Sequence, residues 1–224
     1  MEKKQTKSRE RVRERGEVFT AEREVKAMCD LVKDETERVD SRFLEPACGD
    51  GNFLAEILYR KLNCANINRY KKFPYDWEKE SVLAVGSIYG VDIMLDNVIE
   101  CRKRLFDLWN AKYKAVCKKE CNEQTRESVE FILSKNIVCG NALTLKKVDE
   151  MGNDTDEPIV FSEWTFTTGS QMQRQDYTFA HLLEMNNEEK KDNKQQSMFD
   201  SNQDDEGKFL RRYVTHYRRV KEND

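Results

Sequence analysis

Two glycines, one residue apart, follow a short apolar run in the stretch FLEPACGDGNF at residues 43–53. Gly49 and Gly51 carry no Cβ and adopt positive φ at little cost, so the backbone here can approach a ligand closely. A helical apolar pattern resumes at residues 52–62, which predicts a strand, a glycine turn and a helix in that order. Ligands of α/β sheets bind beyond the carboxyl ends of strands, although such a turn can also be purely structural.

Polar side chains end two further apolar runs. Asp92 closes SIYGVDI at residues 87–93, and Asn141 follows the apolar start of NIVCGNAL at residues 136–143. An acid at the end of a second strand is well placed to accept both hydroxyls of a ribose, and an amide at the end of a third suits a purine edge. Each is singly a common turn residue, but one per strand predicts a nucleoside-binding edge.

Other chemistries lack their motifs in this sequence. The third glycine of G-x-G-x-x-G is missing after Gly51, and no G-x-x-x-x-G-K-[ST] occurs. Cys117 and Cys121 have no second ligand pair beside them, so we expect no metal site. Seven cysteines without the spacing of a secreted scaffold, and no long apolar segment, predict a reduced cytoplasmic protein that does not enter a membrane.

The elements that position these residues follow from apolar periodicity. We expect helices at residues 21–32, 52–62 and 94–116, strands at 43–48, 87–93, 136–143 and 158–166, and a polar, aromatic insertion at 63–80 that carries a short helix. Strands that alternate with helices predict an α/β fold with a parallel sheet.

The chain divides by composition and charge. Its 224 residues suffice for one main domain with extensions, and its net charge is only −3. We predict a basic arm at residues 1–15, a main domain at 16–170, a polar linker or loop at 171–208 and a basic segment at 209–224, which forms a docking helix or a late strand. Either basic cluster suits phosphate contacts or a solvated face.

Four motifs in one order resemble a known family. EPACGDGNFL resembles motif I of class I S-adenosylmethionine-dependent methyltransferases, and its EPACGDG form is similar to adenine-N6 DNA methyltransferases of restriction–modification systems. YGVDI resembles motif II, CGNAL motif III, and RGEVFTA the motif X that precedes motif I in those enzymes. The resemblance covers residues 15–165 and implies a Rossmann-like methyltransferase fold, S-adenosylmethionine as cofactor and DNA as partner.

The resemblance also implies nine cofactor-binding residues. They are Phe19, Thr20, Glu45, Ala47, Gly49, Gly51, Asp92, Ile93 and Asn141. Phe19 and Thr20 would flank the methionine part of the cofactor, and the residues from 45 to 51 would line the loop that contacts it. Asp92 would hold the ribose, Ile93 would pack against adenine, and Asn141 would meet the adenine amine.

The sequence departs from the family at the fourth strand. Adenine-N6 enzymes carry [N/D]-P-P-[Y/F] there, which holds and stacks on a flipped base, but this chain has FSEWTF. Ser162, Glu163 and Trp164 are the catalytic candidates at this position, and a buried core tryptophan is the alternative. The expected sheet is incomplete in its C-terminal half, so a partner subunit, a homo-oligomer or a partial domain is implied.

Two functions are consistent with these residues. The first is a methyltransferase of a DNA modification or restriction system that transfers a methyl group to adenine N6. The second is a catalytically silent cofactor-binding or structural subunit that docks a partner protein or DNA. An RNA or protein substrate stays open.

Overall fold

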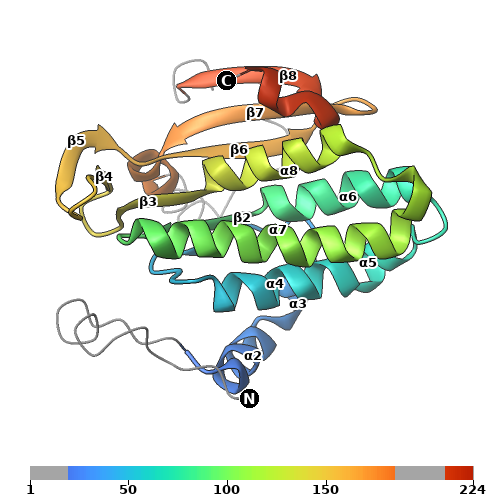
Figure 1. Cartoon of the computed structure of the whole chain (residues 1–224), viewed down its shortest axis with the longest axis horizontal. Helices are drawn as coiled ribbons and strands as arrows, with labels where there is room; N and C mark the ends of the chain where they lie inside the picture. The colour runs from blue at the N-terminus through green and yellow to red at the C-terminus, as the bar shows by residue number, and fades with distance from the viewer. Residues whose placement is uncertain (1–19, 185–209, 224) are drawn as a thin grey trace, which may run out of the picture.

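The computed structural model describes residues 20–184 and 210–223 (Figure 1). The predicted basic arm, Phe19 and residues 185–209 lie outside this range. The helices are α2 (Glu22–Leu31), α3 (Lys33–Thr36), α4 (Asn52–Asn63), α5 (Ala65–Asn68), α6 (Pro74–Gly86), α7 (Leu95–Cys117), η1 (Lys118–Glu120), α8 (Glu123–Asn136) and η2 (Tyr217–Asn223). The strands are β1 (Phe43–Glu45), β2 (Ile88–Asp92), β3 (Ile137–Asn141), β4 (Lys146–Val148), β5 (Asp154–Pro158), β6 (Val160–Phe166), β7 (Gln171–Thr178) and β8 (Arg211–His216).

The strands form two sheets. In the first, β1, β2 and β3 pair in parallel, and the antiparallel strands β4 and β5 extend the sheet beyond β3. In the second, β6, β7 and β8 are antiparallel neighbours. The predicted α/β fold class is therefore confirmed, with a Rossmann-like parallel arrangement of β1, β2 and β3 around the glycine turn.

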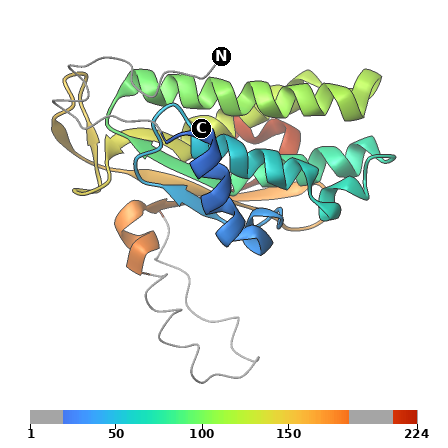
Figure 2. The ribbon, with the colours of Figure 1, turned by 90° about the horizontal axis from the view of Figure 1, so that it is seen from below.

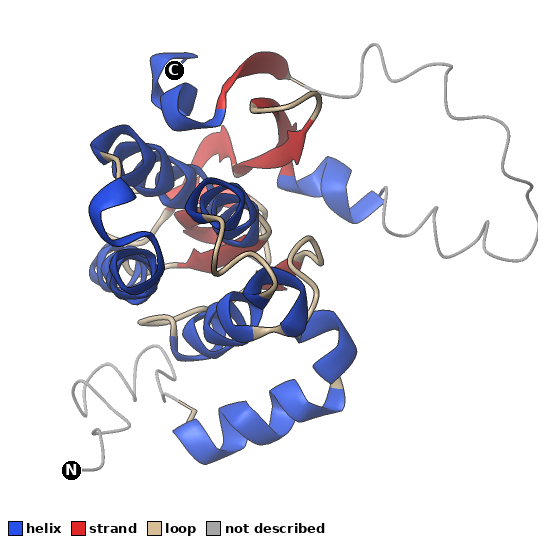
Figure 3. Cartoon of the chain, turned by 90° about the vertical axis from the view of Figure 1, so that its right-hand side faces the viewer, coloured by secondary structure: helices blue, strands red, loops and turns tan. Residues whose placement is uncertain are grey.

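A layer of helices covers one face of these sheets. Figure 2 shows α7, in green, on one side of the strands and the helical turn at residues 179–184, in orange, on the other. Figure 3 shows the helices gathered beside the strands. β2 is buried on both faces, because Ile88 joins the cluster under the helices while Tyr89 and Val91 join the cluster with Phe161 and Phe179. Such two-sided burial is typical of a central parallel strand.

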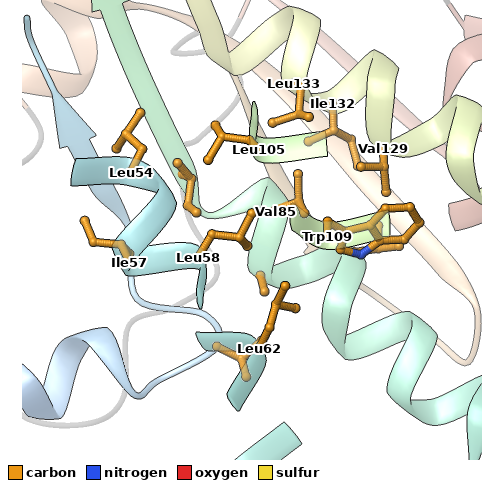
Figure 4. Packing of buried hydrophobic residues seen from close by; sticks show 14 of the residues in the cluster. Leu54, Ile57, Leu58, Leu62, Val85, Leu105, Trp109, Val129, Ile132 and Leu133 are labelled. Atoms are coloured by element: carbon orange, nitrogen blue, oxygen red, sulfur yellow. The ribbon is translucent and has the colours of Figure 1, made fainter. Parts of the chain in front are cut away.

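The main core lies between the helices (Figure 4). Its side chains recur at helical spacing, so each helix turns one apolar stripe inward. Each fully buried aliphatic side chain stabilises the fold by roughly 1.5–3 kcal/mol. The labelled residues, all no more than 1% exposed, are Leu54, Ile57, Leu58 and Leu62 of α4, Val85 of α6, Leu105 and Trp109 of α7, and Val129, Ile132 and Leu133 of α8.

The prediction of a fourth parallel strand at residues 158–166 is wrong. β6 pairs antiparallel with β7, where Ser162 lies opposite Asp176 and Trp164 opposite Arg174. The Ser162 hydroxyl donates to Asp176 Oδ1 at 2.6 Å, which ties the two strands inside the second sheet. Residues 171–178, predicted as the start of a polar linker or loop, form strand β7, which pairs with β6.

One core helix was not anticipated, and another is longer than predicted. No element was predicted at residues 123–136, where α8 lies, and the short helix expected within 63–80 corresponds to α5 and the first part of α6, which continues to Gly86. Trp77 and Val82 of α6 are fully buried, so this segment belongs to the core. Of the two alternatives for the C-terminal basic segment, the late strand is present as β8, and the short helix η2 follows it.

A buried carboxylate ties the C-terminal segment to the helical layer. Glu78 of α6 is 1% exposed and accepts hydrogen bonds from Tyr113 of α7, Thr125 of α8, and Tyr217 and Arg218 of η2. A buried charge is tolerated only when it is paired and hydrogen-bonded, and here four donors from three elements satisfy it. The position of η2 is therefore fixed by a specific polar contact as well as by packing.

A buried lysine holds the turn that leads into β1. Lys61 of α4 is fully buried, and its Nζ donates to the carbonyls of Arg38, Val39 and Ser41 at 2.7, 3.0 and 2.6 Å. Burial lowers the pKa of Lys61 to about 7 from 10.5. The three carbonyls share this donor, and the Val39 carbonyl also accepts from Ser87 Oγ, so Lys61 is the main side-chain contact that holds the turn.

Replacement of this lysine should destabilise the protein. In Lys61→Met, the carbonyls of Arg38 and Ser41 lose this donor and the Val39 carbonyl keeps only Ser87 Oγ, so we expect the free energy of unfolding in urea to fall by about 3 kcal/mol. The wild type should also gain stability as the pH rises from 7 to 10.5, because the unfolded chain then binds one more proton than the folded chain. Lys61→Met should lack that gain in stability. The exposed control Lys26→Met should change the free energy of unfolding little.

Candidate functional site

The carboxyl ends of the three parallel strands meet at one edge of the first sheet. Glu45 ends β1, Asp92 ends β2 and Asn141 ends β3. The register pairs Glu45 with Gly90 and Asp92 with Cys139, so each strand reaches past its neighbour in turn. In Figure 1 this edge lies on the left, where β3 ends and α7 begins.

The glycine turn and the acid of β2 are in direct contact. Gly49 N donates to Asp92 Oδ2 at 2.9 Å. The other oxygen, Oδ1, accepts from Met94 N at 2.8 Å and from Asn97 Nδ2 at 3.2 Å. A carboxylate has about four acceptor positions, so within the described residues Oδ2 retains one for a further donor. Asp92 is half-buried and ends β2 at the sheet edge where ligands of such sheets lie.

The turn has a backbone conformation that favours glycine. Gly49 has φ +52 and Gly51 has φ +85, both in the left-handed region. Gly51 N donates to the Cys48 carbonyl at 2.9 Å, which closes the turn. A Cβ on Gly51 would lie 2.6 Å from Cys101 Sγ of α7, so the missing side chain also lets α4 begin directly against α7.

An ion pair behind the turn was not anticipated. Asp50, between the two glycines, is 3% exposed, and its carboxylate receives Arg104 of α7 at 2.6 and 3.2 Å. Arg104 also donates to the side chain of Asn52 in the first turn of α4. A two-pronged guanidinium contact fixes orientation as well as distance. The acid was visible in the sequence, but its partner lies 54 residues away and has no motif of its own.

The remaining predicted cofactor residues surround this turn unevenly. Glu45 is half-buried, and burial raises the pKa of its carboxyl group. Ala47 is exposed and Ile93 is half-buried beside the turn and Asp92. Thr20 is exposed ahead of α2, whose N-cap is Ala21, and no hydrogen bond among the described residues joins Thr20 to the turn. Phe19 lies outside the described residues.

Asn141 uses its amide locally. Its Oδ1 accepts from Leu143 N at 3.0 Å, and its Nδ2 donates to Asp154 Oδ1 at 3.0 Å. These contacts fix the start of the β4–β5 hairpin at the same edge as Asp92. A ligand contact to Asn141 would use its remaining N–H or lone pair.

The three catalytic candidates do not reach this edge. Trp164 is 3% exposed, its Nε1 donates to Asn136 Oδ1 at 3.2 Å, and it packs on Gly86. Asn136 and Gly86 precede β3 and β2, so Trp164 lies by the amino ends of the parallel strands. This placement gives Trp164 the role of a core residue.

The other two candidates also have partners away from the edge. Ser162 is 2% exposed and hydrogen-bonded to Asp176, and Glu163 forms an ion pair with Arg42. The Glu163–Arg42 ion pair holds the second sheet against the start of β1. The structure therefore does not bring Ser162, Glu163 and Trp164 together with Gly49 and Asp92.

The described residues contain neither a metal-site cluster nor a helix that could span a membrane. Between residues 20–184 and 210–223, no group of three or more His, Cys, Asp or Glu side chains has the geometry of a metal site. Within the same residues, no helix has the length and apolar character required to cross a bilayer.

Fold and site together define an α/β protein with the glycine turn and strand-end acid of a Rossmann-like methyltransferase. The model of the family "MmeI, DNA-methyltransferase domain" matches residues 20–202, and the chain belongs to that family. It is thus a DNA-methyltransferase domain of the restriction–modification type. No curated protein and no solved structure matches the chain.

A side chain on Gly51 should lower the free energy of unfolding more than a side chain on a comparable glycine. Gly51→Ala adds a Cβ at positive φ, about 1–2 kcal/mol, and forces Cys101 to move. Gly169→Ala is the matched control, since Gly169 has φ +60 and open space around it. We expect urea unfolding to show a loss at Gly51 that exceeds the loss at Gly169. Equal losses of stability in the two variants would show that the close approach of the new Cβ to Cys101 of α7 does not destabilise the protein.

The Asp50–Arg104 pair should behave as one unit. Arg104→Met removes the guanidinium group that faces a buried carboxylate, and we expect the free energy of unfolding to fall by about 3–5 kcal/mol. Asp50→Asn in the same chain should restore part of that loss, because the uncompensated charge is gone. A double-mutant cycle measures this coupling. Strictly additive losses would contradict a direct interaction.

Proposed function

We propose that this domain binds S-adenosylmethionine at the edge formed by the glycine turn and Asp92. The observation that supports the proposal most is the hydrogen bond from Gly49 N to Asp92 Oδ2, which joins two predicted cofactor residues 43 positions apart. The bond uses only one acceptor position of Oδ2, so the second suits a ribose hydroxyl. Membership in a DNA-methyltransferase family supports the same cofactor.

The residues at the edge fit the parts of this cofactor. Asp92 would accept the ribose hydroxyls, and the half-buried Ile93 would pack on adenine. Exposed Ala47 and half-buried Gly49 leave the backbone of the turn open for the methionine portion. When bound, the cofactor supplies a methyl group on a positively charged sulfur. Glu45, half-buried at the end of β1, places a carboxyl group at the same edge.

We further propose adenine N6 of DNA as the methyl acceptor. The EPACGDG form of the turn and its resemblance to adenine-N6 enzymes support this choice. The protein's contribution would be to hold cofactor and base in line, which can supply most of the rate gain in such a transfer.

A silent cofactor-binding subunit is the second candidate. It is favoured by the placement of Ser162 and Trp164, whose polar atoms are committed to Asp176 and Asn136 inside the fold. The burial of both side chains disfavours a direct contact with a flipped base. In this case the domain would bind the cofactor and dock a partner protein or DNA.

A partner is also proposed for β1. This strand is at the end of the first sheet, and Leu44 within it is 40% exposed. Open strand edges are usually covered or paired. A partner subunit or a second copy of the chain would cover this edge.

Calorimetric titration with S-adenosylmethionine tests the cofactor site. Asp92→Asn removes the charge but keeps an acceptor for the turn, and we expect binding to weaken about 10–100-fold, the usual range for a hydrogen bond to a charged group. Asp107→Asn on the exposed face of α7 is the control and should bind normally. Unchanged affinity in Asp92→Asn would reject the ribose assignment.

Transfer of a labelled methyl group to mixed-sequence DNA separates the two candidates. The methyltransferase proposal predicts label in N6-methyladenine after nucleoside analysis, and loss of transfer in Asp92→Asn. Cofactor binding without transfer to DNA would favour the silent subunit.

A further inference from the structure

The corner between α5 and α6 combines cations and aromatic rings. Residues 69–75 read RYKKFPY, which includes three cations, three aromatic rings and no carboxylate. Arg69, Lys71 and Lys72 are exposed, and the ring of Phe73 is 58% exposed. A large apolar ring in water has a solvation cost that a bound partner would remove.

The corner is held rigidly. Phe73 N donates to the Tyr70 carbonyl at 2.7 Å, and Lys71 N donates to the Asn68 carbonyl at 3.2 Å. Cys117 Sγ of α7 donates to the Pro74 carbonyl at 3.5 Å, which fastens the corner to the end of the long helix. The backbone that carries the exposed groups is therefore held in place before a partner binds.

The positive charge of the corner is not neutralised within the described part of the chain. Arg69, Lys71 and Lys72 form no ion pair with any described carboxylate. Lys112 of α7 lies close enough to Lys71 that burial and this second cation together lower the pKa of Lys112. Like charges held together destabilise a protein unless an anion joins them.

Two carboxyl groups near the corner do not cancel this charge. Glu80 is half-buried, and burial raises the pKa of its carboxyl group. Arg69 acts on Glu80 by long-range electrostatics and forms no ion pair with it. Asp76 is exposed one turn into α6. Within residues 69–76, the three cations thus outnumber the one exposed carboxylate, Asp76, which leaves an excess of positive charge beside Phe73.

We propose that this corner binds single-stranded nucleic acid. Arg69, Lys71 and Lys72 would contact successive phosphates, while a base stacks on Phe73. An unpaired base is required, because a base inside a duplex has no free face for the ring. Bases also favour nucleic acid over an acidic peptide, which offers carboxylates but no flat partner for Phe73.

This surface is separate from the cofactor edge. In Figure 1 the corner between α5 and α6 lies at the right-hand end of the molecule, whereas β3 ends on the left. The proposal therefore does not rest on methyl transfer. A strand bound here would be held at the opposite end of the domain from Asp92.

Fluorescence anisotropy with a labelled single-stranded oligonucleotide of mixed sequence tests the proposal. Lys71→Glu with Lys72→Glu should weaken binding at least tenfold and reduce the slope of log affinity against log salt by roughly 1.4, for two phosphate contacts. Phe73→Ala should weaken binding about tenfold through lost stacking. Unfolding midpoints should stay unchanged, because these side chains are exposed.

Arg23→Glu with Lys33→Glu on α2 and α3 is the control, with the same change in net charge on exposed side chains. It should bind the oligonucleotide like the wild type. Equal loss in this control, or no loss in the corner variants, would overturn the proposal. It would also be overturned if polyglutamate competes as well as the oligonucleotide, or if the corner variants lose binding only to phosphatidylserine vesicles.

Discussion

The structure depends on the contact between the Asp92 carboxylate and the backbone of the glycine turn. One oxygen takes the amide of Gly49 and the other takes Met94 N and Asn97 Nδ2, so a single carboxylate joins the turn after β1 to the start of α7. Behind the turn, Asp50 and Arg104 make a second connection to the same helix. Two acids thus hold the turn. Asp92 binds its backbone, and Asp50 within it binds Arg104 of α7.

The rest of the fold supports that arrangement. α4, α6, α7 and α8 share one core, so a displacement of α7 would disturb both connections to the turn. Glu78 and the second sheet anchor the far side of the helical layer through η2 and β6. The residues expected to perform chemistry in FSEWTF serve this support: Trp164 fills the space over Gly86, and Ser162 closes the pairing with β7.

Much of the site could be predicted from the sequence because its signals are local. Gly49 and Gly51 indicate a turn with positive φ after β1, and Asp92 ends the apolar strand β2. Because β1 and β2 pair in parallel, the turn and Asp92 lie at the same edge of the sheet. The Asp50–Arg104 pair joins residues 54 positions apart, and no local pattern encodes that distance. The apolar run at residues 158–166 suits a parallel or an antiparallel strand equally, and only its partner β7 decided between them. α8 was missed although Asn122 caps it, because its inward face mixes Thr125 and Ser128 with apolar residues.

The most direct test compares ligands with and without ribose hydroxyls on two proteins. Adenosine and 2′,3′-dideoxyadenosine are titrated against the wild type and Asp92→Asn. If Asp92 Oδ2 accepts a ribose hydroxyl, removal of the hydroxyls weakens binding to the wild type by about tenfold or more and has little effect on the variant. An equal loss in both proteins would show that the sugar is held elsewhere, and would contradict the site described for this domain.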